Sequence, residues 1–311
     1  MKTTHNHSRR EFLEMGRALA AGGALSSFFV EAFADGLEKI EAQAVKVLWL
    51  QAQSCSGCSV SLLNSMDPGP VDLVTRFISL QLHQSIGAAQ GHLIQDIIEK
   101  VEDAGPFVLV MEGSIPTAMP EACMMYGKPM AEIIDPLLRK ALAVASIGTC
   151  AAFGGIPGAE GNLTGAVSIQ EFMVKKGIPI KNRLVNVPSC PPHPKSMVGT
   201  LAYIAGRGYP EVDEKLLTPK MFYSSSTHDN CPRYHDYARH IFAKDFGDPG
   251  CLFKLGCLGP ITKTECPTRQ WNGGVNWCVR ASSPCIGCST KDFAKKRDFP
   301  FYRLPESPEE L

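Results

Sequence analysis

The stretch VKVLWLQAQSCSGC, residues 45–58, decides the fold class, because a strand pattern leads directly into a pair of cysteines. Its first part, 45–50, is an apolar run broken only by Lys46, which predicts a buried β-strand. The same pattern recurs along the chain, with further strands expected at 107–111, 144–147 and 184–187 and helices between them at 92–103, 131–143 and 169–176. This alternation predicts an α/β domain whose mostly parallel sheet is covered on both faces.

The composition is ordinary except for its cysteines. The chain has 311 residues, 44% hydrophobic and 20% charged, and its 31 basic and 31 acidic side chains give no argument for nucleic acid or an anionic membrane surface. Seven of the twelve cysteines lie after residue 219, in a part rich in Pro and Gly with few long apolar patterns. Such a loop-rich part needs bound groups to hold it together.

A first set of thiols, here called the Cys55 group, consists of Cys55, Cys58, Cys150 and Cys190. Each thiol follows a predicted strand, and ligands of open parallel sheets bind at the carboxyl ends of strands, so the four should meet there. Structural zinc sites are usually local in sequence, whereas this group spans the domain. The pattern therefore favours an iron–sulfur cluster over zinc or disulfides, which stay open as alternatives.

A second set, the His228 group, consists of His228, Cys231, Cys251 and Cys257. A single His–Cys pair would mean little, but two further cysteines close behind it predict a four-ligand site. Three cysteines and one histidine bind either zinc or a [4Fe–4S] cluster, and the spacing does not separate the two.

A third set, the Cys266 group, consists of Cys266, Cys278, Cys285 and Cys288. Four thiols could hold a [4Fe–4S] cluster, and three of them a [3Fe–4S] cluster. Nearby aromatic residues would exclude water from it: Trp271, Trp277 and Phe293. Only Cys123 is left over, and we interpret it as a buried small hydrophobic residue.

The N-terminus predicts export. Residues 8–13, SRREFL, form a twin-arginine pattern, and an apolar run at 18–30 precedes small residues near 32–34 and 42–44 where cleavage could occur. The run is shorter than the roughly 20 residues that span a bilayer. We therefore expect residues 1–44 to be a signal peptide and cleavage region, the protein to reach the periplasm already folded, and no later segment to anchor it in the membrane.

These motifs together resemble the small subunit of nickel–iron hydrogenases over nearly the whole chain. The matching pieces are CSGC at 55–58, EGSIP at 112–116, GTCA at 148–151, CPPHP at 190–194, the His228 group, Cys266-Pro267, and PCIGC at 284–288. The resemblance implies a flavodoxin-like doubly wound domain at 45–218 and a cluster-bearing domain at 219–311. It also implies a large partner subunit with the nickel–iron site, and no catalytic residue in this chain.

By the same resemblance the three groups form a relay. The Cys55 group is the proximal cluster facing the partner, the Cys266 group is medial, and the His228 group is a distal [4Fe–4S] cluster near the exit. Glu112 matches a family glutamate that supports the proximal site. A chain without a membrane anchor implies a soluble acceptor such as a multihaem cytochrome c.

Two departures from the family pattern refine this interpretation. Most members have proline where this chain has Cys278, so a fourth thiol favours a medial [4Fe–4S] cluster, as in the nickel–iron–selenium branch. Gly57 and Gly155 stand where oxygen-tolerant relatives have extra cysteines, so a modified proximal cluster is not expected. The rival functions are another cluster-relay oxidoreductase, such as a quinone-reductase subunit, and a zinc-stabilised interaction module.

Overall fold

The strand that opens the fold has apolar side chains on both of its faces. This computed structural model describes residues 46–72 and 79–295. In it, β1 (Lys46–Gln51), the strand that precedes the cysteine pair, lies inside a sheet. Leu48 and Leu50 pack on one face, and Val47 and Trp49 on the other. Successive side chains of a strand point to opposite faces, so both faces of this sheet are covered.

The sheet has the strand order β2-β1-β3-β7-β9, and each neighbouring pair is parallel. The strands are β1, β2 (Ser79–His83), β3 (Phe107–Glu112), β7 (Ala143–Ile147) and β9 (Leu184–Val187). Numbered along the sheet-forming strands, this is the order 2-1-3-4-5 of flavodoxin-like proteins, whose strand order reverses between β1 and β3. The predicted fold class is confirmed.

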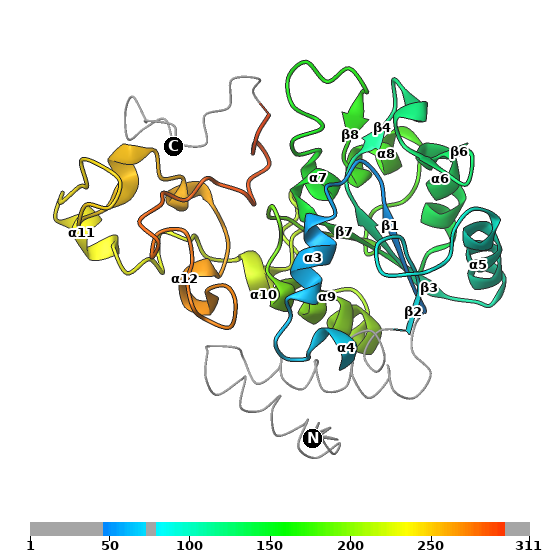
Figure 1. Cartoon of the computed structure of the whole chain (residues 1–311), viewed down its shortest axis with the longest axis horizontal. Coiled ribbons are helices and arrows are strands. Elements are labelled where there is room, and N and C mark those ends of the chain that lie inside the picture. The colour runs from blue at the N-terminus through cyan, green and yellow to red at the C-terminus, as the bar shows by residue number, and fades with distance from the viewer. Residues whose placement is uncertain (1–45, 73–78, 296–311) are drawn as a thin grey trace, which may run out of the picture.

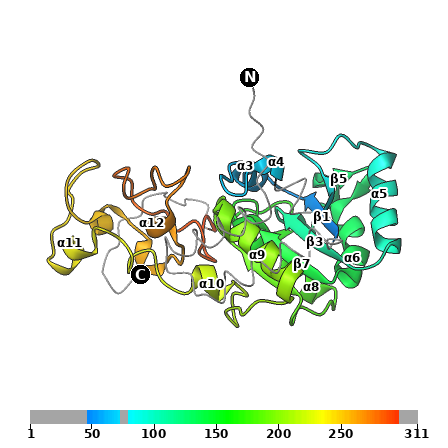
Figure 2. The same ribbon diagram turned by 90° about the horizontal axis from the view of Figure 1, so that it is seen from below.

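Helices cover the two faces separately (Figures 1 and 2). One face packs against α5 (His92–Asp103), α6 (Met130–Lys140) and α8 (Ile169–Lys175). The other packs against α3 (Gly57–Leu63), α9 (Pro194–Arg207) and α10 (Lys220–Tyr223). The remaining elements are short: α4 (Pro70–Asp72), β4 (Ile115–Pro116), η2 (Pro120–Ala122), β5 (Met124–Met125), β6 (Lys128–Pro129), α7 (Gly148–Phe153), β8 (Ala166–Val167), α11 (Tyr234–Ala238), η3 (Leu252–Leu255), η4 (Gly259–Ile261) and α12 (Cys266–Arg269).

One predicted helix is too long. The pattern at 131–143 predicts a helix into Ala143, but α6 ends at Lys140 and Ala143 already belongs to β7. Arg183 explains the boundary, because its guanidinium donates to the backbone carbonyls of Leu138, Arg139 and Ala141. Those are the carbonyls that the end of a helix leaves without partners. The edge strand β2 and helix α9 were not predicted.

The part after α10 is built mainly of loops and very short helices, as its composition predicts. Its core is a small cluster that includes two cysteine side chains: Ala243, Leu252, Cys257, Trp277, Val279 and Cys285. This part lies beside the α/β part, with α11 at the far end of the long axis (Figures 1 and 2). Within the described residues, no helix has the length and apolar character needed to cross a bilayer. The predicted signal peptide lies outside the described residues.

Candidate metal centres

The Cys55 group lies where the strands of the sheet end. Cys55 and Cys58 follow β1, Cys150 lies in α7 directly after β7, and Cys190 follows β9. Burial raises the pKa of Cys58 well above its usual range, and the nearby Glu112 carboxylate and the other three thiols raise it further. The four predicted side chains therefore come together, at the edge where β1 and β3 mark the reversal of strand order.

Glycines leave room around these sulfur atoms. A Cβ at Gly148 would lie 2.4 Å from the Sγ of Cys58, and one at Gly155 would lie 2.7 Å from the Sγ of Cys150. A Cβ at Gly57 would approach the Sγ of Cys55 to 3.1 Å. Gly148 also has a φ of 87°, a backbone conformation that side chains with a Cβ rarely adopt. The backbone is thus shaped to pass close to the thiols.

Glu112, the last residue of β3, lies buried beside this group with 1% of its surface exposed. An ionised carboxylate in such a place needs hydrogen-bond donors. The donors to its two oxygens are the indole of Trp49, the amide of Gln51, the hydroxyls of Ser54 and Ser59, and the backbone N–H of Cys58. Glu112 therefore holds the cysteine loop in place through Ser54 and Cys58.

His83 extends this network, and sequence reasoning missed it. The Nδ1 atom of His83 accepts a hydrogen bond from the backbone N–H of Ser85, so Nε2 carries the proton and donates to the Ser59 hydroxyl, 3.1 Å away. Burial lowers the pKa of His83, although Glu112 opposes this. Its strand β2 is a short edge strand with alternating polar residues, so its sequence pattern carries little signal.

The Cys266 group lies between the two parts of the chain. Burial raises the pKa of Cys288 to about 12, with the thiols of Cys266 and Cys278 adding to the effect. Burial also raises the pKa of Cys285 well above its usual range, and the thiol of Cys288 adds to it. Cys278 is on the exposed side of the group. The structure therefore brings these four thiols together too.

The His228 group lies next to α11. Burial raises the pKa of Cys251 to about 11, with contributions from the thiols of Cys257 and Cys231. His228 is beside them: a Cβ at Gly259 would lie 3.4 Å from the Sγ of Cys257 and 3.7 Å from the backbone nitrogen of His228. Rings of Tyr234 and Tyr237 pack edge-on against the imidazole, with centroids 5.0 and 4.5 Å away. These aromatic contacts fix the ring and exclude water from one side of the group.

The three groups touch one another in a fixed order. The hydroxyl of Thr149, the residue before Cys150, donates to the backbone carbonyl of Cys288 at 2.5 Å, which joins the Cys55 group to the Cys266 group. The backbone N–H of Cys285 donates to the Sγ of Cys257 at 3.3 Å, which joins the Cys266 group to the His228 group. The Cys266 group therefore occupies the middle position.

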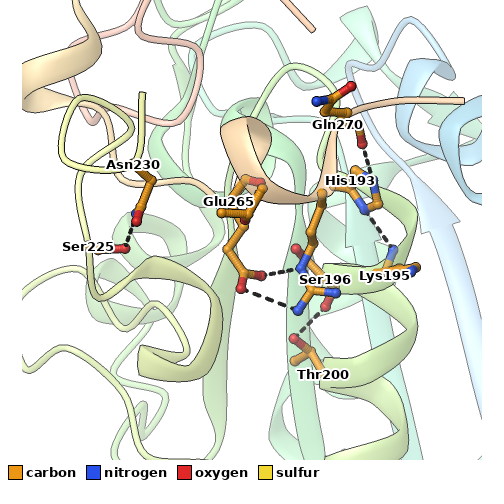
Figure 3. A network of polar contacts seen from close by, with 10 residues as sticks. His193, Lys195, Ser196, Thr200, Ser225, Asn230, Glu265 and Gln270 are labelled. Carbon is orange, nitrogen blue, oxygen red and sulfur yellow. Dashed lines mark hydrogen bonds and ion pairs between the residues drawn. The ribbon is translucent and has the colours of Figure 1, made fainter. Parts of the chain in front are cut away.

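A polar contact beyond the groups also ties the two parts together (Figure 3). The Nδ1 atom of His193, three residues after Cys190, accepts from the backbone N–H of Lys195. Its Nε2 therefore carries the proton and donates to the backbone carbonyl of Gln270, 2.8 Å away, just after α12. Burial lowers the pKa of His193 to about 4, so the ring is neutral at pH 7.

All twelve cysteines lie in the described part of the chain, and none of them forms a disulfide there. Cys123, the one outside the three groups, is partly buried and packs against the core between the sheet and α6. In residues 46–72 and 79–295, no three His, Cys, Asp or Glu side chains converge closely enough to hold a single metal ion. The site therefore consists of eleven free thiols and one imidazole in three adjoining groups.

A flavodoxin-like domain with thiols at its strand ends, followed by a cysteine-rich loop domain, defines a class of redox subunits. Residues 55–204 match the family described as NADH ubiquinone oxidoreductase, 20 Kd subunit, and residues 223–302 match the C-terminal family of the NiFe/NiFeSe hydrogenase small subunit. The small subunit of the periplasmic [NiFeSe] hydrogenase of Desulfomicrobium baculatum is 39% identical, over 95% of this chain and 98% of that protein. The chain belongs to the NiFe/NiFeSe hydrogenase small-subunit family.

Further relatives and solved structures agree. The hydrogenase-2 small chain of Escherichia coli K12 is 38% identical over 92% of this chain and 77% of that protein. The structure of a reduced, active form of the Ni-Fe-Se hydrogenase from D. baculatum superposes with a TM-score of 0.78, covering 85% of this chain and 100% of that one. The structure of a recombinant [NiFeSe] hydrogenase from Desulfovibrio vulgaris Hildenborough superposes with a TM-score of 0.77, at 36% sequence identity, covering 84% of this chain and 98% of that one.

The residues present fit the iron–sulfur clusters that the family implies. Soft thiolates and an imidazole are the ligands that such clusters take. A buried thiol with a raised pKa loses its proton only when a nearby positive charge, such as that of iron, compensates the negative charge of the thiolate. Binding of a cluster and folding of the segments that carry its thiols are therefore coupled. The close glycines around the Cys55 group leave the sulfur atoms free of neighbouring side chains.

Proposed function

We propose that the chain is the electron-transferring subunit of a hydrogenase and holds three [4Fe–4S] clusters in a row. The observation that carries this proposal is the contact order of the groups: from Thr149, next to Cys150, to Cys288, and then from Cys285 to Cys257. The bound clusters would supply one-electron carriers, and the protein would fix their separations and potentials. The proximal ligands are Cys55, Cys58, Cys150 and Cys190; the medial ligands are Cys266, Cys278, Cys285 and Cys288; the distal ligands are His228, Cys231, Cys251 and Cys257.

The remaining residues act on these ligands. Glu112 holds the backbone of Cys58 through its carboxylate, which orients the thiol toward its group. The buried Trp277, and Tyr237 beside His228, keep water away from the medial and distal groups. Ligand identity, hydrogen bonds to sulfur and exclusion of water are the means by which a protein sets a cluster potential. The chain supplies no acid, base or hydride chemistry of its own.

The partner is a large subunit with the nickel–iron site, which would dock beside the Cys55 group. Cys55 is exposed, and the adjacent α3 and α4 present apolar side chains to solvent: Val60 at 56%, Leu63 at 40% and Val71 at 71% exposure. Contiguous exposed apolar residues mark interaction surfaces. The named relatives are small subunits or small chains of hydrogenases, which supports a heterodimer.

The electrons leave or enter at the other end, through the His228 group beside α11. The proposed acceptor is a soluble multihaem cytochrome c in the periplasm, where the relatives from D. baculatum and Nitratidesulfovibrio vulgaris are named as periplasmic. Export would follow the twin-arginine route indicated by residues 8–13. Cys278 supports a medial [4Fe–4S] cluster and a partner of the nickel–iron–selenium type.

The role of the His228 group as the exit of the relay can be tested by substitution. Replacing His228 by glutamine in the assembled heterodimer should slow reduction of the cytochrome by hydrogen far more than hydrogen–deuterium exchange, which needs only the partner's site. The matched control is His92→Gln, an exposed histidine at the start of α5. Equal losses of both reactions in His228→Gln would argue against an exit role.

A further inference from the structure

The two junctions between the groups are built differently. In the junction between the Cys266 and His228 groups both hydrogen-bond donors are backbone amides: the N–H of Cys285 donates to the Sγ of Cys257, and the N–H of Leu258 donates to the carbonyl of Cys285 at 2.7 Å. These two segments lie close in the same loop-rich part. No side chain outside the two cysteine groups takes part in these two hydrogen bonds.

The junction between the Cys55 and Cys266 groups depends on one hydroxyl, that of Thr149. This residue precedes Cys150 and is 1% exposed. Its Oγ1 accepts a hydrogen bond from the backbone N–H of Ser189, at 3.0 Å, and donates to the backbone carbonyl of Cys288, at 2.5 Å. The backbone N–H of Thr149 donates to the carbonyl of Ser189 at 3.0 Å. Thr149 thus links the segments that carry Cys150, Cys190 and Cys288.

The backbone that Thr149 holds is strained. Ser189 has a φ of 120°, a backbone conformation that residues with a Cβ rarely adopt. Such a conformation persists only when its surroundings hold it, and both backbone polar groups of Ser189 bind Thr149. The next residue along the chain is Cys190, so the contacts of Thr149 with Ser189 and Cys288 hold the Cys190 segment beside Cys288. Loss of the hydroxyl would let Ser189 relax and the Cys190 segment move away from Cys288.

We propose that Thr149 is a positioning residue for electron transfer between the Cys55 and Cys266 groups. Its hydroxyl would hold the Cys190 segment against Cys288, so that the electronic contact between the two groups runs through a short hydrogen-bonded path. The step moves one electron, which oxidises the site at one group and reduces the site at the other, and no bond forms or breaks. This inference rests on the proposed relay function.

The test compares three variants of the assembled heterodimer. Thr149→Val keeps the side-chain shape but removes both hydrogen bonds, and Thr149→Ser keeps the hydroxyl. Thr200→Val is the control, because Thr200 is equally buried and its hydroxyl bonds only within α9, to the carbonyl of Ser196 (Figure 3). The measurements are iron content, hydrogen–deuterium exchange at the partner's site, hydrogen oxidation with a dye, and amide exchange of the peptide containing Ser189 and Cys190.

In Thr149→Val we expect full iron content, unchanged exchange at the partner's site, and dye reduction slowed severalfold, because the contact between the two groups is weakened. Amide exchange at Ser189 and Cys190 should rise about fivefold, the equivalent of one hydrogen bond in the opening equilibrium. Thr149→Ser and Thr200→Val should match the wild type in all four measurements. Wild-type dye reduction together with full iron in Thr149→Val would overturn the inference.

A second variant covers the case in which Thr149→Val does not retain its iron. Thr149→Val/Ser189→Gly removes the strain, since glycine adopts a φ of 120° at little cost, so it should regain iron while electron transfer stays slow. Full recovery of the rate in this double variant would overturn the inference. Failure of the proposed relay function can be told apart from failure of this inference, because in that case the wild type itself would contain no iron–sulfur clusters.

Discussion

Replacing Gly148 by alanine tests the fit of the Cys55 group more sharply than removing a thiol does. The added Cβ would lie 2.4 Å from the Sγ of Cys58, at least about 1 Å inside the normal contact distance of such atoms. Cys58 has little freedom to retreat, because its backbone N–H is held by Glu112. The substitution should therefore displace a sulfur ligand and not only strain the chain.

The backbone cost can be separated with a matched control. Gly148 has a φ of 87° and Gly127, in the β5–β6 hairpin, a φ of 82°, so alanine at either position costs about 1–2 kcal/mol in backbone strain. A Cβ at Gly127 would meet nothing within 4 Å. Any loss found for Gly148→Ala but not for Gly127→Ala therefore comes from the contact with Cys58.

The assay is iron and acid-labile sulfide per purified chain, together with the free energy of unfolding. Gly148→Ala should lose about four iron atoms, those of one [4Fe–4S] cluster, and should be destabilised by more than Gly127→Ala. Gly127→Ala should keep its full iron content. Equal iron content in the two variants would refute the reasoning that the space beside Cys58 is shaped for a cluster.

Three further predictions concern single residues. Glu112→Gln should cost about 1–3 kcal/mol of stability, because the new NH₂ group cannot accept the hydrogen bonds that a carboxylate oxygen of Glu112 now accepts from donors such as Ser54 and Cys58. The control Glu211→Gln, at an exposed position, should leave the unfolding free energy almost unchanged. Between pH 7 and 5 the wild type should lose about 2 kcal/mol more stability than His193→Gln. The reason is that the pKa of His193 is about 4 in the folded chain and about 6.5 in the unfolded chain, so the unfolded chain takes up the proton first as the pH falls. Parallel curves of unfolding free energy against pH for the two proteins, from denaturant titrations, would contradict this. Cys278→Pro should give the oxidised protein a [3Fe–4S] EPR signal that the wild type lacks, and a full-intensity signal in the wild type would exclude Cys278 as a cluster ligand.

The parts of the fold that the sequence predicts are those where local pattern and burial agree. β1, β3, β7 and β9 are apolar runs because both faces of the sheet are covered, and the helix at 92–103 is found with the predicted bounds. β2 escapes prediction because it lies at the sheet edge and alternates with polar residues. α9 escapes because it is buried on most of its surface, which removes the amphipathic pattern that reveals a helix.

The candidate sites show a similar limit. Cysteine spacing predicts the members of all three groups, and for the Cys55 group the strand positions add that thiols at the ends of neighbouring parallel strands lie close together. The contacts between groups are different, because they join residues as distant as Thr149 and Cys288 through single hydrogen bonds. Neither spacing nor periodicity carries information on such contacts. The network of His83 and Ser59 around Glu112 is hidden for the same reason.

The central claim is that three four-iron clusters are held in a row by eleven cysteines and one histidine. Iron and acid-labile sulfide counting on the anaerobically purified heterodimer, with EPR before and after exposure to hydrogen, tests it most directly. We expect about twelve iron and twelve sulfide atoms in this chain, no [3Fe–4S] signal when oxidised, and cluster signals that appear with hydrogen. A colourless chain with bound zinc, or clusters that hydrogen does not reduce, would contradict it.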